Sequence, residues 1–232
     1  MENSTPKNRR TAAEGVSRRT KSVVREYAEA ILIALVAALF LRAFVVQAFK
    51  IPSGSMIPTL EIGDHILVNK LAYGIRLPDI NWLPVVGCVD LSNGSHLVEW
   101  DIPKRGDVVV FVYPRDRCKD FIKRVVGIPG DEVEIRNKKV YVNGKAVQDL
   151  RAYFEDPELA RGPNGVRDNF GPVRVPKNHI FVMGDNRDRS YDSRFWGFVP
   201  IQDVRGRAFI KYFSWDSDNG SPRWSRMGNL IY

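Results

Sequence analysis

A single long apolar segment stands near the start of the chain. Residues 30–41 include no charged side chain, and the apolar character resumes after Arg42 and continues to Phe49. The segment 30–41 alone is too short for a bilayer, but about 20 helical residues reach ~30 Å, the thickness of the hydrocarbon core. Arg42 lies near the end of this stretch, where a guanidinium can reach the lipid headgroups. The pattern predicts one transmembrane anchor helix over 27–49.

Three other structures fit this segment less well. A buried core helix leaves the basic cluster that precedes the segment unexplained. A cleaved signal peptide requires small residues at −3 and −1 from its cut, and no clear A-x-A follows Leu41. An amphipathic surface helix requires a polar face, which residues 30–41 lack.

The distribution of charge supports the membrane interpretation. The formal net charge of +8 favours either nucleic acid or an anionic membrane surface as a partner. Most of the excess lies in the first 25 residues, directly before the apolar segment. No helix-turn-helix, zinc-finger or RNA-binding motif accompanies it. We therefore expect a lipid bilayer, and no nucleic acid, as a partner.

The positive-inside rule gives the anchor an orientation. Residues 1–26 are expected to form a basic cytoplasmic tail, and the polar composition of 1–21 predicts disorder there. Residues 50–232 are expected to form a domain outside the cytoplasm. The predicted location is the inner (plasma) membrane, crossed once, with the domain on the periplasmic side.

The rest of the chain has the pattern of a β domain. Turns are predicted at Asn137–Lys138 and at Asn143–Gly144, and the segments 75–103 and 148–175, rich in Pro, Gly and Asn, are expected to be loops. No long amphipathic helical pattern follows Phe49. Apolar runs and apolar–polar alternation predict strands over 107–113, 132–136, 139–142, 179–183 and 207–213. The expected fold class is mainly β, with an antiparallel sheet and one N-terminal transmembrane helix.

Two hydroxyls, Ser53 and Ser55, lie in a Gly- and Pro-containing segment just after the predicted anchor. Such a segment is most often an ordinary turn. A serine nucleophile needs a base to take its proton. His65 follows Asp64, which leaves a Ser–His–Asp triad open, although the chain has no G-x-S-x-G motif.

Lys123 is the other candidate base, and it stands between apolar residues in the sequence DFIKRVVG. A lysine in a strand usually faces solvent. Burial among apolar side chains would instead disfavour the ammonium and lower its pKa from about 10.4. A base with a pKa near the working pH is the most effective one. A third polar segment, 183–200, concentrates acids, arginines and serines, and its simplest interpretation is a loop held by Asp–Arg pairs.

Four stretches of the chain together resemble the type I signal peptidase family. In the family's order, after a membrane helix, they are IPSGSMIPTLEIGDHILVNK, RGDVVVFVYP, DFIKRVVGIPGDEVEI and GDNRDRSYDSRFWGFVP. Each motif is only modestly specific, whereas the four in order are strongly specific. The resemblance is weak across 75–103 and 148–175.

The resemblance implies a β-sheet catalytic domain and a serine endopeptidase, signal peptidase I, that cuts signal peptides from exported preproteins. It implies Ser55 as the nucleophile and Lys123 as the general base. Ser190 would orient the lysine amine, and Ser53 would form the oxyanion hole with the Ser55 N–H. The resemblance implies no metal or cofactor. Ion-pair support of the site would come from Asp185, Asp192 and Arg194.

Substrates of the family carry small residues, usually Ala, at −1 and −3. By resemblance the −1 pocket would be lined by Met56, Leu60, Phe121 and Ile122, and the −3 pocket by Phe49, Ile51, Ile66, Val110 and Ile122. These apolar residues suit a protein core equally well. The family has no catalytic His, and its residue at the position of His65 is normally apolar, a departure that concerns packing.

Two other functions stay open. A self-cleaving regulator protease shares the Ser–Lys dyad and a similar β fold, but it would bring a DNA-binding domain, and none is visible in the sequence. A membrane-tethered module that binds partners through 183–200 would tolerate replacement of Ser55 and Lys123. The spacing of Cys88 and Cys118 does not decide whether they form a disulfide.

Overall fold

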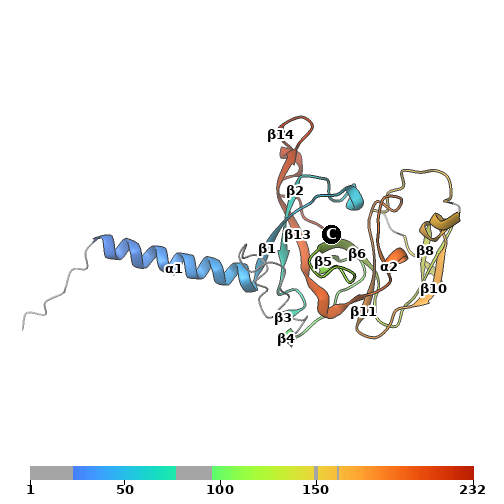
Figure 1. Cartoon of the computed structure of the whole chain (residues 1–232), viewed down its shortest axis with the longest axis horizontal. Coiled ribbons are helices and arrows are strands. Elements are labelled where there is room, and N and C mark those ends of the chain that lie inside the picture. Colours follow the sequence, from blue (N-terminus) through green and yellow to red (C-terminus); the bar gives the residue numbers. More distant parts are fainter. Residues whose placement is uncertain (1–22, 77–95, 149–150, 161) are drawn as a thin grey trace, which may run out of the picture. The chain divides into compact units, whose positions relative to one another are not determined.

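The computed structural model describes residues 23–76, 96–148, 151–160 and 162–232. The chain divides into two compact units at Ala38 and Leu39 (Figure 1). The disorder predicted for 1–21 lies outside the described residues, and so does Cys88. Cys118 is disulfide-bonded.

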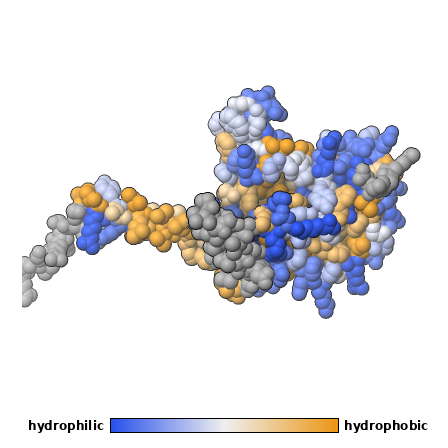
Figure 2. Space-filling view, viewed as in Figure 1, coloured by the Kyte–Doolittle hydropathy of each residue, from blue (hydrophilic) through white to orange (hydrophobic). Residues whose placement is uncertain are grey.

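Helix α1 spans Val23–Phe44, so it begins and ends earlier than the predicted 27–49. Its 22 residues measure about 33 Å, enough to cross the hydrocarbon core of a bilayer. The helix ends at Phe44 and strand β1 follows over Val46–Lys50, whose first residue is a β-branched valine, a type that favours strands. Among the described residues α1 is the one helix long and apolar enough to cross a membrane. Figure 2 shows hydrophobic residues along it.

Most of the strands belong to one antiparallel sheet. Within the described residues its order is β1-β2-β13-β5-β6-β11-β12, and β14 pairs with β13. Strands β5 and β6 are central, and all five residues of β5 are buried. The strands predicted near 107–113, 179–183 and 207–213 are confirmed. The bounds are β1 Val46–Lys50, β2 Asp64–Asn69, β5 Val108–Val112, β6 Asp120–Gly127, β11 His179–Met183, β12 Val199–Pro200, β13 Val204–Asp216 and β14 Ser221–Pro222.

A second sheet has the order β10-β7-β8-β9. Its strands are β7 Glu132–Arg136, β8 Lys139–Val142, β9 Lys145–Ala146 and β10 Phe170–Arg174. Asn137 and Lys138 between β7 and β8, and Asn143 and Gly144 between β8 and β9, all have positive φ, as tight hairpin turns require. Both predicted turns and the strands 132–136 and 139–142 are confirmed.

Three strands correct the expectation that 75–103 and 148–175 are loops. Strand β3 (Gly74–Arg76) pairs with β4 (His96–Glu99), and β10 lies in the second segment. They are short, and Gly171-Pro172 interrupts β10 where its register shifts, which weakens the alternation that reveals a strand. After α1 the described helices are all short, as expected: η1 Gly54–Met56, η2 Gly162–Arg167, α2 Ser193–Trp196, η3 Ile201–Asp203 and η4 Trp224–Arg226.

One cluster of buried apolar side chains lies against β1, β2, β5 and β13. It includes Ile51, Met56 and Leu60 from the segment that follows β1. Each of these three side chains is almost fully buried, and burying a side chain of this size contributes ~1.5–3 kcal/mol. The segment that carries Ser55 is therefore pinned to the core on both sides of the serine.

Candidate active site

Ser55 lies in the short helix η1, within residues 54–60, which we call the Ser55 turn. The Leu60 N–H donates to the Met56 carbonyl at 2.8 Å and closes the turn. Ser55 is 8% exposed, so its hydroxyl stands at the edge of the core. Ser53, two residues earlier, has an extended backbone and is exposed.

Lys123 lies in β6, opposite Val109 of β5. Its Nζ is 2.7 Å from Oγ of Ser55 and donates to the Ile122 carbonyl at 3.0 Å. Lys123 is only 4% exposed. The sheet thus brings together the two residues named as nucleophile and base, although they stand 68 positions apart in sequence.

Burial lowers the pKa of Lys123 from 10.5 to about 8. Taking the ammonium out of water disfavours the charged form. Two carboxylates, Asp192 and Asp185, act in the opposite direction and raise this pKa, whereas the Arg194 guanidinium lowers it further. A substantial fraction of the amine is therefore neutral in mildly alkaline solution, and a neutral amine can take a proton from a hydroxyl 2.7 Å away.

The loop after β11 packs directly on the Ser55 turn. The Asn186 N–H donates to the Ser55 carbonyl at 3.2 Å. A side chain at Gly184 would overlap the Ser55 carbonyl oxygen and the Ser190 hydroxyl, so this position accepts only glycine. The loop therefore holds the backbone of the serine as well as the side chains around it.

Asp192 and Arg194 form a buried bidentate ion pair, with both N–O distances 2.8 Å. Burial by itself would raise the pKa of Asp192, but the charge and hydrogen bonds of Arg194, together with hydrogen bonds from Ser190 and the Gly184 N–H, lower this pKa. The Gly184 N–H donates to the Ser190 hydroxyl oxygen and to the Asp192 carboxylate, both at 3.1 Å. In the described structure Ser190 makes this contact rather than a hydrogen bond to Lys123.

Asp185 pairs with an arginine that the sequence interpretation did not select. Arg124 donates to its two carboxylate oxygens at 2.7 and 2.6 Å, and the Thr59 hydroxyl donates to it at 2.5 Å. Both ions of this pair are buried. The signal that could have revealed Arg124 is its place beside Lys123 in an apolar strand, where a second cation needs a buried acid.

The structure does not support a Ser–His–Asp triad. His65 Nδ1 lies 3.1 Å from the Gly63 carbonyl, and its ring packs against Phe213. The Asp64 carboxylate accepts from Ser214 and Arg226. Consecutive residues of a strand point to opposite faces, so Asp64 and His65 cannot act together on one serine.

The apolar residues expected to contact substrate fall mostly in one place. Seven of the eight belong to or pack on the cluster that pins the Ser55 turn: Phe49, Ile51, Met56, Leu60, Ile66, Val110 and Ile122. Phe121 packs on a neighbouring cluster and stacks on Tyr113, with ring centroids 4.3 Å apart. Phe49, Phe121 and Ile122 are partly exposed, so only these three offer much surface to a ligand, and the others are mainly core residues.

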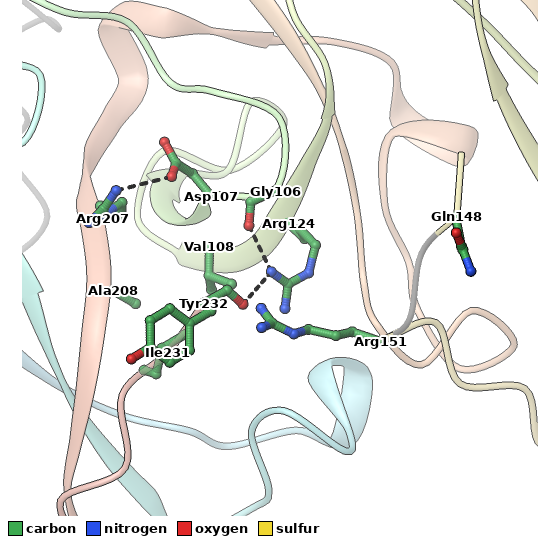
Figure 3. A pocket seen from close by; sticks show the side chains of 10 residues that line it. All are labelled: Gly106, Asp107, Val108, Arg124, Gln148, Arg151, Arg207, Ala208, Ile231 and Tyr232. Carbon is green, nitrogen blue, oxygen red and sulfur yellow. Dashed lines mark hydrogen bonds and ion pairs between the residues drawn. The ribbon is translucent and has the colours of Figure 1, made fainter. Parts of the chain in front are cut away.

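A cavity of about 430 Å³ borders Arg124 but not the hydroxyl–amine pair (Figure 3). There Arg124 donates to the carbonyls of Gly106 and Tyr232, each at 2.7 Å. Neither Ser55 nor Lys123 lines this cavity. Arg124 therefore contacts both Asp185 and the cavity. The cavity does not include the Ser55 hydroxyl or the Lys123 amine.

Comparison with known proteins agrees with the motifs. The profile of the family described as signal peptidase, peptidase S26, matches residues 24–215. The chain is 38% identical over 235 residues to a signal peptidase I of Pseudomonas aeruginosa, covering 88% of this chain and 78% of that protein. It is 36% identical over 194 residues to a probable signal peptidase I-2 of Synechocystis, covering 81% and 72%.

A crystal structure of a signal peptidase I from Enterococcus faecalis is 31% identical and covers 45% of this chain and 95% of that one. Its TM-score of 0.37 is too low to support a comparison of folds. The profile and the two relatives span most of the chain, and they confirm the resemblance seen in the four motifs. The chain belongs to the signal peptidase (peptidase S26) family.

Proposed function

We propose that this chain is a membrane-anchored serine endopeptidase that removes signal peptides from exported preproteins with a Ser55–Lys123 dyad. The observation that carries the proposal is the 2.7 Å separation between the lysine amine and the serine hydroxyl. Family membership supports a peptidase acting on signal peptides. A partner-binding module would have no use for a lysine buried against a serine, and the apolar helix α1 favours an anchored peptidase over a DNA-bound regulator.

In the first half of the reaction, Ser55 Oγ attacks the carbonyl carbon of the substrate residue at −1. The neutral Lys123 amine takes the hydroxyl proton as the bond forms. The resulting ammonium then gives this proton to the leaving amine, and the C–N bond breaks. The mature protein departs, and the signal peptide stays joined to Ser55 as an ester.

In the second half, Lys123 takes a proton from water, and the hydroxide attacks the ester. The Ser55–carbonyl bond breaks, and the serine recovers its proton from the ammonium. The oxyanion formed in each half needs aimed donors. We assign this role to the Ser55 N–H and the Ser53 hydroxyl, which is exposed and makes no hydrogen bond within the described residues.

The remaining polar residues have a positioning role in this proposal. Ser190 and Asp192 hold the Gly184 N–H, and Asp185 holds the Thr59 hydroxyl. Ser190 would orient the Lys123 amine when substrate is bound. The Asp192–Arg194 pair sets the electrostatic surroundings of that amine, because both charges act on its pKa.

We place the protein in the inner membrane, crossed once by α1, with its N-terminus in the cytoplasm. The length and hydropathy of α1 support a spanning helix, and the positive-inside rule supports the orientation, because basic residues precede the helix. The active site would then work outside the cytoplasm, on signal peptides held in the lipid bilayer.

Small residues at −1 and −3 are expected to be required in the substrate. The apolar side chains beside Ser55 are mostly buried, so shallow pockets at Phe49, Phe121 and Ile122 would admit a methyl group and exclude larger ones. We expect full-length protein in detergent to cut a peptide with an Ala-x-Ala site after the second Ala. Replacing that Ala by Leu in the peptide should lower kcat/KM by about 100-fold, since overlap of a larger side chain costs ~1–3 kcal/mol. Mass spectrometry of the products gives the site, and equal cleavage of the Leu peptide would refute the pocket assignment.

The pH dependence of cleavage should follow Lys123. Only the neutral amine acts as a base, and its neutral fraction rises as pH rises through its pKa in the folded protein, about 8. We expect kcat/KM, which reports the free enzyme, to rise with pH and reach half its maximum near pH 8. An ordinary lysine would place this midpoint near 10.5. A rate that is constant from pH 6 to 9 would contradict the assignment of the base.

A further inference from the structure

Lys123 is not the only buried lysine among the described residues. Lys211 lies in β13 and is 8% exposed. Its Nζ donates to the carbonyl of Thr59, the penultimate residue of the Ser55 turn, at 3.3 Å. Within the described residues this is the only hydrogen bond of its amine. A lysine is costly to bury, so the contact between its ammonium and the Thr59 carbonyl indicates a role beyond packing.

The acidic groups around Lys211 are already paired with arginines. Asp64 accepts from Arg226 at 2.7 Å, and Glu61 pairs with Arg226 at 2.8 Å and with Arg223 at 2.5 Å. In the part of the chain that the structure describes, Lys211 forms no ion pair of its own. Its charge is therefore directed to the Thr59 carbonyl, which also accepts from Arg226 at 3.3 Å.

Thr59 connects this contact to the dyad. Its hydroxyl donates to Asp185, and the carbonyl of Ser55 accepts from Asn186. The turn is thus held at its serine end by the loop after β11 and at its far end by Lys211 and Arg226. A shift at Thr59 would move Ser55 against Lys123, and the two atoms must stay within hydrogen-bond reach for proton transfer.

We propose that Lys211 is a positioning residue for the cleavage reaction: its ammonium holds the Thr59 carbonyl and so keeps Ser55 aligned with Lys123. The proposal rests on the proposed function of the dyad. Because Lys211 acts on alignment and touches no substrate, it should affect kcat far more than KM.

The charges around Lys211 give the proposal a pH signature. Burial and the Arg226 charge lower the pKa of Lys211, while Asp64 and Glu61 raise it, and the net direction is downward. The ammonium is present below this pKa and is lost as pH rises through it. The part of the activity that depends on this ammonium should therefore be lost as pH rises through the pKa of Lys211, which gives an alkaline decline.

The test compares Lys211→Met and Lys211→Arg in full-length protein, with an Ala-x-Ala peptide as substrate. We expect Lys211→Met to lower kcat by about 10- to 100-fold, the range for a misplaced reacting group, with KM within about twofold. Lys211→Arg should recover most of kcat and move the alkaline decline to higher pH, because a guanidinium stays charged. Lys145→Met, at an exposed lysine of β9, is the matched control and should behave as wild type.

Wild-type kcat in Lys211→Met would overturn the proposal. The proposal is also wrong if wild-type activity shows no alkaline decline, or if Lys211→Arg declines at the same pH as wild type. These two outcomes decide the question if Lys211→Met does not fold. Ser55→Ala in the same assay separates a failure of the proposed dyad from a failure of the positioning role of Lys211. If Ser55→Ala still cleaves, the dyad itself is wrong; if it is inactive and Lys211→Met is normal, only the positioning role fails.

Discussion

Replacing Lys123 by Met should abolish cleavage and at the same time stabilise the fold. Without a base the Ser55 hydroxyl keeps its proton, and losing one member of such a catalytic unit costs about 10⁴- to 10⁶-fold in kcat. The native amine has a pKa of about 8 against 10.5 when solvated. At pH 7 it is mostly charged in both states, so burial destabilises the fold by about 3 kcal/mol, at ~1.36 kcal/mol per pKa unit.

The stability gained in Lys123→Met should depend on pH. The penalty is fully present below pH 8 and disappears as pH rises toward 10.5, because the amine is then neutral in both states. The free energy of unfolding of Lys123→Met should exceed that of wild type by up to ~3 kcal/mol at pH 7, less the contribution of the lost hydrogen bonds to Ser55 and Ile122. The gain should shrink as pH rises.

Urea unfolding followed by circular dichroism measures the stability, and peptide cleavage measures the rate. Ser55→Ala should be equally inactive without the gain in stability, and Ser221→Ala, at an exposed serine of β14, should match wild type. A Lys123→Met protein that cleaves at more than a thousandth of the wild-type rate would refute the dyad. An unchanged or reduced stability at pH 7 would show that the amine is not desolvated.

Asp192→Asn should strongly destabilise the protein. The Arg194 side chain is 1% exposed and the Asp192 side chain fully buried. Removing the carboxylate leaves a buried guanidinium without its counter-ion, a change that typically costs ~3–5 kcal/mol. The Gly184 N–H also loses an ionised acceptor. Both effects act directly beside the dyad.

The same substitution should shift the pH dependence of cleavage. Asp192 raises the pKa of Lys123, and Arg194 lowers it. Without Asp192 this pKa falls below about 8, so in the fraction that still folds the acid limb of kcat/KM moves to lower pH. Asp116→Asn, in a solvent-accessible pair with Lys119, is the control and should leave stability close to that of wild type, because surface ion pairs contribute little. A loss of less than ~1 kcal/mol in Asp192→Asn would contradict the prediction.

Local patterns predicted those elements whose structure is decided locally. The hairpin of β7 and β8 alternates buried and exposed residues and turns at two residues that tolerate positive φ, so its signals lie within a few positions of one another. Strand β1 escaped prediction because its apolar residues continue the composition of α1. Its pairing with β2 and the partial burial of Phe49 depend on contacts with distant residues.

In strand β6 the burial of two side chains could not be predicted from local patterns. Lys123 and Arg124 are consecutive, so they point to opposite faces of the sheet, and alternation alone would expose one of them. Both are nevertheless buried, because residues distant in sequence pack against each of them. Only the fold supplies Asp185 to Arg124 and Ser55 to Lys123.

The sequence by itself determined the family and the apolar helix and singled out Ser55 and Lys123 as the proposed dyad, because motif order and hydrophobic runs are properties of the chain. The tertiary structure alone decided that the amine is dry, that Arg124 is the partner of Asp185 and that Lys211 reaches Thr59. Desolvation and ion pairing depend on the atoms packed around a group, and here those atoms come from segments more than sixty residues away.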